Sequence, residues 1–441
     1  MTEIANRQLL EMTTTHFVAF LRRHEIDRCY FVWDDDAGAV RASHGVLQPI
    51  AEALAADTRD YDRHEGVFLQ VDDAGASLMG AFVHRTCRGQ GQGGMRFWPY
   101  DTLADFLNDG LRLAMGMTQK NALAGLWWGG GKGVIARDPD TDYSDPIRRR
   151  ELMRNYGRFV TSLRGCYVAA EDIGIDPRDV ADIYSQTRFV TCIPETIGGS
   201  GNPSPATAEG VVQGMEAALA FLDDTLEGAR IVIEGLGHVG EAMVGMLLER
   251  GVASIVGTDI DCCVTEAVER RIDDARLEVR TTPRGDHSVL TEPCDIVSPC
   301  ATGGAITPTI VEAMQCRVVC GAANNQLEDA ARDDELLMAR GIVYVPDFLV
   351  NRMGIVNCAN EQYGALPDDP AIRRHLDPKE EGSVYRTTLR VLEDARDSKT
   401  PPGKAATTLA EKMSMTPHPI FGHRGQAIVR SLVNEGWEKN G

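Results

Sequence analysis

The sequence predicts an α/β protein of two domains, with an open parallel sheet in the second. Apolar patterns typical of strands and helices run through the first 200 residues, and a Gly- and Pro-rich stretch at 197–207 divides the chain. The part that follows opens with a strand, a glycine-rich turn and a helix. We expect an N-terminal extension at 1–66, a first domain at 67–205, a second domain at 206–360 and a helical C-terminal segment at 361–441.

The composition is that of a globular protein with an acidic surface. Of 441 residues, 43% are hydrophobic, and 65 acidic against 45 basic residues give a formal net charge of −20. This balance disfavours a nucleic-acid partner, because affinity for a phosphate backbone depends on clustered Lys and Arg. The polar N-terminal sequence, with no run of about 18 apolar residues anywhere, predicts neither a signal peptide nor a membrane span. The 11 cysteines have neither zinc-site spacing nor disulfide-scaffold density, so we expect reduced thiols, no metal and a cytoplasmic protein.

The beginning of the chain has the pattern of two hairpins followed by a long helix. Residues 30–40, YFVWDDDAGAV, and residues 67–83 both read as strand, turn and strand, with DDAG as the turn in each. From Leu103 onward apolar residues recur at helical spacing, and Lys120 lies near the end of that predicted helix.

Three glycines in succession directly precede Lys132 in the stretch GLWWGGGKG. Glycine weakens strands and helices, so this run predicts that another group approaches the backbone closely. If Lys120 and Lys132 meet in a cleft, each ammonium group disfavours the other, and one lysine with a lowered pKa becomes a usable general base. In YVAAEDIGI, Asp172 follows a predicted strand that ends at Ala170, and its carboxylate could offset that effect or carry protons itself. The sequence alone leaves open whether these groups converge.

The clearest motif is a G-x-G-x-x-G pattern formed by Gly235, Gly237 and Gly240. It follows the strand pattern IVIE and precedes the helical EAMVGMLLER, and Asp259 ends the next strand pattern, SIVGTD. Such glycines admit the pyrophosphate of a dinucleotide to a helix N-terminus, where free N–H groups and the helix dipole favour negative charge. Asp259 would bind the adenosine ribose hydroxyls and repel the additional phosphate of NADP. We therefore expect a doubly wound Rossmann domain that binds NAD. A tight turn without a ligand, and Asp261 as the ribose ligand, are the alternatives.

Seven motifs together resemble the glutamate/leucine/phenylalanine/valine dehydrogenase family, most of all its leucine and phenylalanine branch. They occur in the family's order within residues 67–365: GMTQKNALAGLWWGGGKGVI, YVAAEDIG, GNPSPATAEGV, IEGLGHVG, CDIVSPCATGGAI, GAANNQL and PDFLVNRMGIVN. The resemblance implies an N-terminal substrate-binding α/β domain that faces the Rossmann domain across a cleft. It also implies reversible oxidative deamination of an L-amino acid to a 2-oxo acid and ammonia, by a homo-oligomer.

The same resemblance implies roles for individual residues. Lys120 would bind the substrate α-carboxylate, Lys132 would activate water and Asp172 would shuttle protons. In the family's closed state, the glycines before Lys132 would let substrate and nicotinamide lie against bare backbone. The implied substrate-binding residues are Lys120, Gln92, Gly93, Gly94, Ala170, Asn325, Asn351, Ile355 and Cys358. The implied cofactor-binding residues are Gly235, Gly237, His238, Val239, Gly240, Asp259, Thr207, Ala301 and Asn325.

The substrate side chain is expected to be neutral and mainly hydrophobic. Gln92 stands where the glutamate branch has a lysine for the distal carboxylate, and Ala170, Ile355 and Cys358 match pocket walls. An unpaired carboxylate among such residues would be costly. Arg352 opposes this reasoning, because its guanidinium could enter the pocket and make the protein a dehydrogenase of glutamate or another polar amino acid. A catalytically silent NAD-binding homologue and a Rossmann dehydrogenase of another chemistry are the remaining alternatives.

Overall fold

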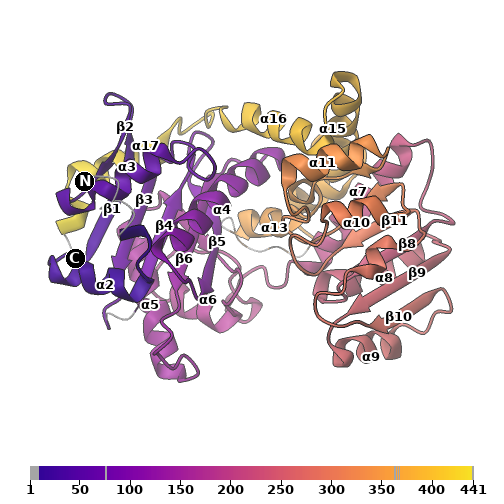
Figure 1. Cartoon of the computed structure of the whole chain (residues 1–441), viewed down its shortest axis with the longest axis horizontal. Coiled ribbons are helices and arrows are strands. Elements are labelled where there is room, and N and C mark those ends of the chain that lie inside the picture. The colour runs from indigo at the N-terminus through magenta and orange to yellow at the C-terminus, as the bar shows by residue number, and fades with distance from the viewer. Residues whose placement is uncertain (1–8, 75–76, 362–363, 365, 367, 440–441) are drawn as a thin grey trace.

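The computed structural model describes residues 9–74, 77–361, 364, 366 and 368–439. In this part of the chain two lobes are formed, each a β-sheet covered by helices (Figure 1). The predicted two-domain α/β fold is thereby confirmed, while the three exact boundaries between the four predicted segments stay a prediction. Gly75 of the second predicted turn and the first eight residues of the polar N-terminal sequence lie outside the described residues.

The first lobe contains a mixed seven-stranded sheet in the order β2-β1-β3-β4-β6-β5-β7. Both predicted hairpins are present, and β5 and β7 are the strands that run parallel to β6. Strands β1 and β2 come from the expected extension at 1–66, yet β1 pairs with β3 in this sheet. The strands are β1 (Arg28–Asp34), β2 (Ala39–Ala42), β3 (Gly66–Val71), β4 (Leu78–Val83), β5 (Gly91–Trp98), β6 (Gly129–Ala136) and β7 (Tyr167–Ala170).

Helices cover both faces of this sheet. Successive side chains of a strand point to opposite faces, and apolar side chains on both faces are buried under helices. Phe31 and Val67 pack in a core with helices α2, α3 and α4. Their neighbours Tyr30 and Phe68 pack in a second core with α5, α6 and α17. These helices are α2 (Thr14–Arg23), α3 (Gln48–Ala56), α4 (Leu103–Leu123), α5 (Pro146–Ser162), α6 (Pro177–Tyr184) and α17 (Arg424–Asn434). The predicted helix from Leu103 is α4, which begins with a capping box between Thr102 and Asp105.

The second lobe contains a parallel six-stranded sheet in the order β10-β9-β8-β11-β12-β13. Counted from β8, this is the 3-2-1-4-5-6 order of a doubly wound dinucleotide-binding sheet. Its strands are β8 (Arg230–Glu234), β9 (Ser254–Asp259), β10 (Leu277–Thr281), β11 (Ile296–Pro299), β12 (Val318–Val319) and β13 (Val343–Tyr344). Its helices are α7 (Ser204–Phe221), α8 (His238–Glu249), α9 (Cys262–Arg271), α10 (Pro308–Ala313) and α11 (Ala330–Ala339).

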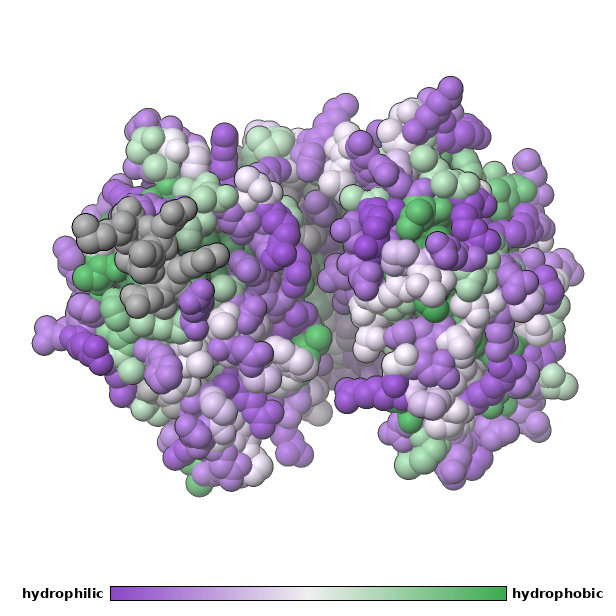
Figure 2. Space-filling model, in the orientation of Figure 1, coloured by the Kyte–Doolittle hydropathy of each residue, from purple (hydrophilic) through white to green (hydrophobic). Residues whose placement is uncertain are grey.

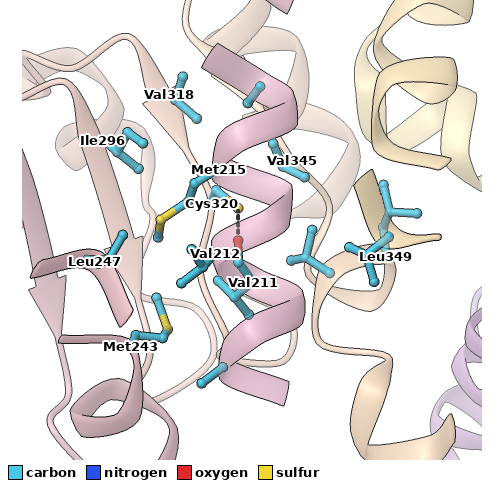
Figure 3. Close-up of a cluster of buried hydrophobic side chains, with 14 of the residues drawn as sticks. Val211, Val212, Met215, Met243, Leu247, Ile296, Val318, Cys320, Val345 and Leu349 are labelled. Atoms are coloured by element: carbon cyan, nitrogen blue, oxygen red, sulfur yellow. Dashed lines mark hydrogen bonds between the residues drawn. The ribbon is translucent and has the colours of Figure 1, made fainter. Parts of the chain in front are cut away.

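Helix α7 is the centre of the larger core of this lobe (Figure 3). Val212 and Met215 face Met243 of α8 and Ile296 of β11, and the Sγ atom of Cys320 donates a hydrogen bond to the carbonyl of Val211 on this helix. The opposite face of the sheet is covered by α10 and α11 in a separate core. The strand ends that carry the glycine motif are therefore fixed by packing on both faces.

The C-terminal part of the chain contacts both lobes (Figure 1). Its helices are α12 (Asp347–Val350), α13 (Met353–Glu361), α14 (Pro370–Leu376), α15 (Val384–Ser398), α16 (Pro402–Ser414) and the α17 given above. Side chains of α15 and α16 enter the core around α7, whereas those of α17 enter a core of the first lobe. Among the described helices, none combines the length and apolar character needed to cross a lipid bilayer.

Candidate active site

A cavity of about 800 Å³ lies between the two lobes, and Figure 2 shows a furrow there on the surface. Lys120 of α4, Lys132 of β6 and Asp172, just beyond β7, all line it from the first lobe. His238 of α8 and Asn325 line it from the second lobe. The structure therefore brings the two lysines and the aspartate to the same cavity, beside the start of the helix that follows the glycine motif.

Lys132 and Asp172 form a close ion pair inside the cavity. The Nζ atom of Lys132 lies 2.5 Å from Oδ2 of Asp172, and Nε of Arg96 lies 3.5 Å from the same oxygen. Burial acts to raise the pKa of Asp172, but Lys132 and Arg96 outweigh it, so this pKa lies below its usual value. Arg96 is held in turn by Asp109 of α4, whose Oδ2 lies 2.9 Å from its Nη1. Asp172 is thus ionised and has a fixed position.

Lys120 is the lysine with a clearly lowered pKa. Its pKa falls to about 8, chiefly because the surrounding protein desolvates this half-buried side chain, with Lys132 a smaller cause and Asp347 opposing the shift. The expectation of a lowered lysine pKa therefore applies to Lys120, and desolvation contributes more to it than repulsion between the lysines. Burial also raises the pKa of Asp347, against hydrogen bonding from the Asn325 backbone N–H and the charge of Lys120.

The three glycines before Lys132 accommodate other parts of the protein. They begin strand β6, and a Cβ on Gly130 would lie 2.0 Å from Oγ1 of Thr118 and 2.4 Å from the carbonyl oxygen of Ala114, both in α4. A Cβ on Gly129 would lie 2.0 Å from the carbonyl oxygen of Arg85. Protein atoms therefore occupy the side-chain positions of these glycines, and the approach of substrate and nicotinamide to their backbone in a closed state remains a prediction. The missing side chain of Gly130 lets α4 lie directly on β6, and Lys120 of α4 and Lys132 of β6 line the same cavity.

The glycine motif has the geometry that a dinucleotide pyrophosphate needs. Gly235 has a φ of +100°, and Gly240 packs so closely that a Cβ would lie 2.0 Å from the carbonyl oxygen of Gly235. Gly237 precedes α8 without a side-chain cap, and a Cβ there would meet nothing within 4 Å. The first and third glycines thus shape the turn, and the second leaves open space at a helix N-terminus. A Cβ on Gly235 would also meet the backbone nitrogen of Ala301 at 2.7 Å, which places Ala301 beside this turn.

Asp259 lies at the end of β9, beside the glycine turn. Its Oδ2 accepts a hydrogen bond from the backbone N–H of Leu236 at 2.9 Å, and its Oδ1 accepts one from that of Asp261 at 3.0 Å. Asp261 instead caps α9, with Oδ1 accepting from the N–H of Cys263 at 2.8 Å. This difference favours Asp259 as the ribose ligand. Val239, the next predicted cofactor residue, is partly buried against the core around α7.

Besides Lys120, five predicted substrate-binding residues line the cavity. They are Gly94, Ala170, Asn325, Ile355 and Cys358. Asn325 has a φ of +54°, and its backbone N–H donates to Oδ2 of Asp347 at 3.0 Å. The roles expected for these residues remain predictions.

Gln92 and Gly93 do not line this cavity. Gln92 is fully buried, and its Nε2 donates to Oγ1 of Thr191 at 3.4 Å. A Cβ on Gly93 would lie 1.9 Å from the carbonyl oxygen of Gly131, so this glycine serves the packing of β5 on β6. The alternation of side chains along β5 directs Gly94 and Arg96 to the cavity, whereas Gly93 points elsewhere.

Asn351 and Thr207 also lie outside the cavity wall. Nδ2 of Asn351 donates to the carbonyl of Ala322 at 3.0 Å and to Oδ1 of Asn324 at 2.9 Å, and Asn324 does line the cavity. Oγ1 of Thr207 donates to the carbonyl of Pro203 at 3.0 Å in the first turn of α7. In this structure both side chains are bound to the protein itself.

Arg352 is turned away from the cavity. Its side chain is fully buried, and its guanidinium donates to the carbonyl oxygens of Leu123 and Gly382 and to Oγ1 of Thr387. The carbonyl of Leu123 belongs to the last turn of α4, where the helix dipole favours a cation. In this structure the guanidinium of Arg352 therefore does not enter the pocket, because groups at the junction of α4, α13 and α15 bind it.

Sequence reasoning missed Arg96 and Asp347. Arg96 follows Gly94 at the spacing of two residues that places strand side chains on one face, which is the signal that could have found it. Asp347 lies within the PDFLVN motif at the start of α12, and nothing in its neighbourhood distinguishes it from a capping residue.

Comparison with known proteins supplies the family. Residues 69–189 match the model described as Glu/Leu/Phe/Val dehydrogenase, dimerisation domain, and residues 198–413 match that of Glutamate/Leucine/Phenylalanine/Valine dehydrogenase. The chain belongs to the Glu/Leu/Phe/Val dehydrogenase family. The resemblance found in the motifs is confirmed, and this chain is an NAD(P)-dependent amino-acid dehydrogenase.

Three relatives illustrate the similarity. Leucine dehydrogenase from Bacillus subtilis is 39% identical over 354 residues, which are 80% of this dehydrogenase and 91% of the relative. Valine dehydrogenase from Streptomyces coelicolor is 38% identical over 355 residues, 80% of this chain and 93% of the relative. The crystal structure of L-tryptophan dehydrogenase from Nostoc punctiforme is similar with a TM-score of 0.66 at 31% identity, covering 80% of this chain and 96% of that one.

Proposed function

We propose that this dehydrogenase uses NAD to deaminate a neutral, hydrophobic L-amino acid oxidatively and reversibly to its 2-oxo acid and ammonia. The proposal rests on the number of Lys and Arg side chains in the cavity that have no carboxylate partner. Among the described Lys and Arg residues that line it, Lys120 alone has no carboxylate oxygen within 4 Å. One available cation matches one substrate carboxylate.

The other cations of the cavity already have partners. Lys132 pairs with Asp172, Arg96 with Asp109 and Asp172, and Arg112 also with Asp109. A second substrate carboxylate would therefore have to compete with an existing ion pair. Leaving it unpaired would cost several kcal/mol.

The nonpolar part of the cavity suits an aliphatic or aromatic side chain. Its wall includes Leu113 and Met117 of α4, Phe348 of α12 and Ile355 of α13. These side chains come from both lobes, so a hydrophobic substrate would contact both. The names of the leucine, valine and tryptophan dehydrogenase relatives support the same substrate class.

The proposed chemistry divides the work among three side chains. Lys120 binds the α-carboxylate through its protonated form. NAD supplies the hydride acceptor, and hydride loss from the substrate Cα leaves a positively charged iminium. That charge disfavours the ammonium form of Lys132, which passes its proton toward Asp172 at 2.5 Å and then accepts one from water. The hydroxide adds to the iminium carbon, and proton return through Asp172 and Lys132 releases ammonia.

The preference for NAD over NADP is proposed from Asp259. Both carboxylate oxygens are held by backbone N–H groups of the turns beside the nucleotide site. The additional phosphate of NADP would meet this fixed negative charge. The open space at Gly237 and the uncapped start of α8 support a pyrophosphate between them.

We also propose that the enzyme is a homo-oligomer. The family model matched by residues 69–189 is described as a dimerisation domain, which supports this assignment. Light scattering after size-exclusion chromatography would test it, and a monomer at micromolar concentration would contradict it.

The substrate class is tested by initial rates of NADH formation with leucine, valine, phenylalanine, tryptophan and glutamate. We expect kcat/KM for the best hydrophobic amino acid to exceed that for glutamate by at least about 100-fold, since ~3 kcal/mol of unpaired-charge cost corresponds to that factor. Glutamate as the best substrate would overturn the proposal. An Arg352→Met variant in the same panel separates the alternative, because a glutamate activity that depended on Arg352 would fall selectively there.

A further inference from the structure

Two cysteines face each other at the edge of the cavity. The Sγ atoms of Cys192 and Cys358 lie 2.7 Å apart, and both residues line the cavity. Cys192 follows Val190, which bridges to Ala169 of β7 in the first lobe. Cys358 lies on α13, which packs on α7 of the second lobe. The pair therefore spans the junction of the lobes.

A separate set of hydrogen bonds holds the two cysteines in register. Glu361, one turn beyond Cys358 on α13, accepts backbone N–H bonds from Cys192 at 2.6 Å, Ile193 at 2.8 Å and Ser200 at 3.0 Å. Cys192 has a φ of +64°, a left-handed conformation that is uncommon for a residue with a side chain. The carboxylate of Glu361 thus fixes the strained segment on α13 and presents one thiol to the other.

We propose that Cys192 and Cys358 are a redox modification site, at which a hydroperoxide oxidant forms a reversible disulfide that links the two lobes and suppresses turnover. A disulfide requires an S–S distance of about 2.05 Å, so a small side-chain movement suffices to form it.

The two thiols have different parts in the reaction. Cys192 is partly exposed at the cavity and meets the oxidant first. It attacks the peroxide O–O bond, becomes a sulfenic acid and releases water or an alcohol. Cys358 is buried, and its hydrogen bond with Cys192 together with burial raises its pKa. Its sulfur then attacks the sulfenic sulfur, forming the S–S bond while its proton leaves with the hydroxyl as water. A dithiol reductant returns both thiols and is itself oxidised to a disulfide.

The crosslink would act where the lobes meet. Ala359, next to Cys358, packs in a small cluster with Trp128 and Val168 of the first lobe. A covalent bond beside this contact holds α13 at one distance from the segment after β7. Because a substrate cleft must open for exchange and close to exclude water, such a tether lowers kcat.

The experiment uses the full-length enzyme with Cys262 and Cys263 replaced by Ser, because these adjacent exposed thiols would react first. The protein is treated with hydrogen peroxide, the remaining thiols are alkylated, and peptides are mapped by mass spectrometry. We expect a linked peptide between Cys192 and Cys358, and a fall in kcat of at least about fivefold that dithiothreitol reverses. The variants Cys192→Ser and Cys358→Ser should form no linked peptide. Peroxide should also cause no reversible fall in kcat when each variant is compared with its own reduced form.

Two results would overturn the proposal. One is the absence of the 192–358 peptide at peroxide concentrations that oxidise Cys262 and Cys263 in the parent protein. The other is a complete crosslink with unchanged kcat. Peptide mapping does not depend on the substrate, so a failure of the proposed function would leave the first result intact and the two proposals distinguishable.

Discussion

Replacing Gly130 by Ala tests whether close packing of α4 on β6 builds the active site. The added Cβ would lie 2.4 Å from the backbone carbonyl oxygen of Ala114, where real contacts are rarely under 3.4 Å. A backbone atom cannot rotate away, so α4 must retreat by about 1 Å, and Lys120 moves with it. Overpacking of this kind costs about 1–3 kcal/mol. A displacement of about 1 Å at a catalytic group can cost about 100-fold in rate.

Thermal unfolding and initial rates check both parts of this prediction. For a domain of this size we expect Tm to fall by about 2–12 °C, and kcat/KM to fall by about 10- to 100-fold. Gly245→Ala in α8 is the matched control, because its Cβ meets nothing within 4 Å and alanine is the better helix former, by about 1 kcal/mol. A Gly130→Ala enzyme with unchanged Tm and kcat/KM would refute the packing argument. If Tm fell but the folded enzyme kept its kcat/KM, the proposed link between this packing and the position of Lys120 would be refuted.

Three further predictions concern charged groups of the site. Lys132→Ala should lower kcat by about 10²–10⁴-fold, the usual contribution of positioned proton transfer, while NADH fluorescence titration shows nearly unchanged binding. Because burial lowers the pKa of Lys120 to about 8 and only its protonated form holds a carboxylate, the affinity for an unreactive branched carboxylic acid should fall as pH rises through about 8. An affinity for this acid that stayed constant between pH 7 and 9 would contradict the prediction, and Lys120→Gln should abolish the pH dependence of that affinity. Asp259→Asn keeps a hydrogen-bond acceptor but removes the charge, so the ratio of kcat/KM with NAD to kcat/KM with NADP should fall by about tenfold. A wild-type enzyme that prefers NADP would contradict the assignment of Asp259 as the ribose ligand.

Local patterns in the chain were sufficient to predict much of the fold. The two hairpins, the helix from Leu103 and the strand–turn–helix at Gly235 each depend on spacing between near neighbours, which periodicity records directly. The strand, turn and strand at 30–40 were also predicted, but the membership of these strands in the first sheet was not. Strand pairing depends on contacts between residues that are distant in sequence. Strand β1 pairs with β3, although β2 and helix α3 lie between them along the chain.

The site residues divide in the same way. The motif order predicted which lysines and which aspartate to examine, and the structure places Lys120, Lys132 and Asp172 in one cavity. The motif order could not predict that Gln92 is fully buried and does not line the cavity, or that Arg352 binds groups at the junction of α4, α13 and α15. A motif fixes where a residue stands along the chain, whereas the direction of its side chain depends on what packs around it.

Residue types and their local spacing were enough to predict the family, the doubly wound nucleotide fold and the charged residues to examine. How those charged groups pair with one another became known from the folded structure. Gly130 lets α4 lie on β6, desolvation lowers the pKa of Lys120, and Asp109 and Asp172 both form ion pairs with Arg96. Desolvation and ion pairing depend on atoms brought together from distant parts of the chain, and no local pattern contains them.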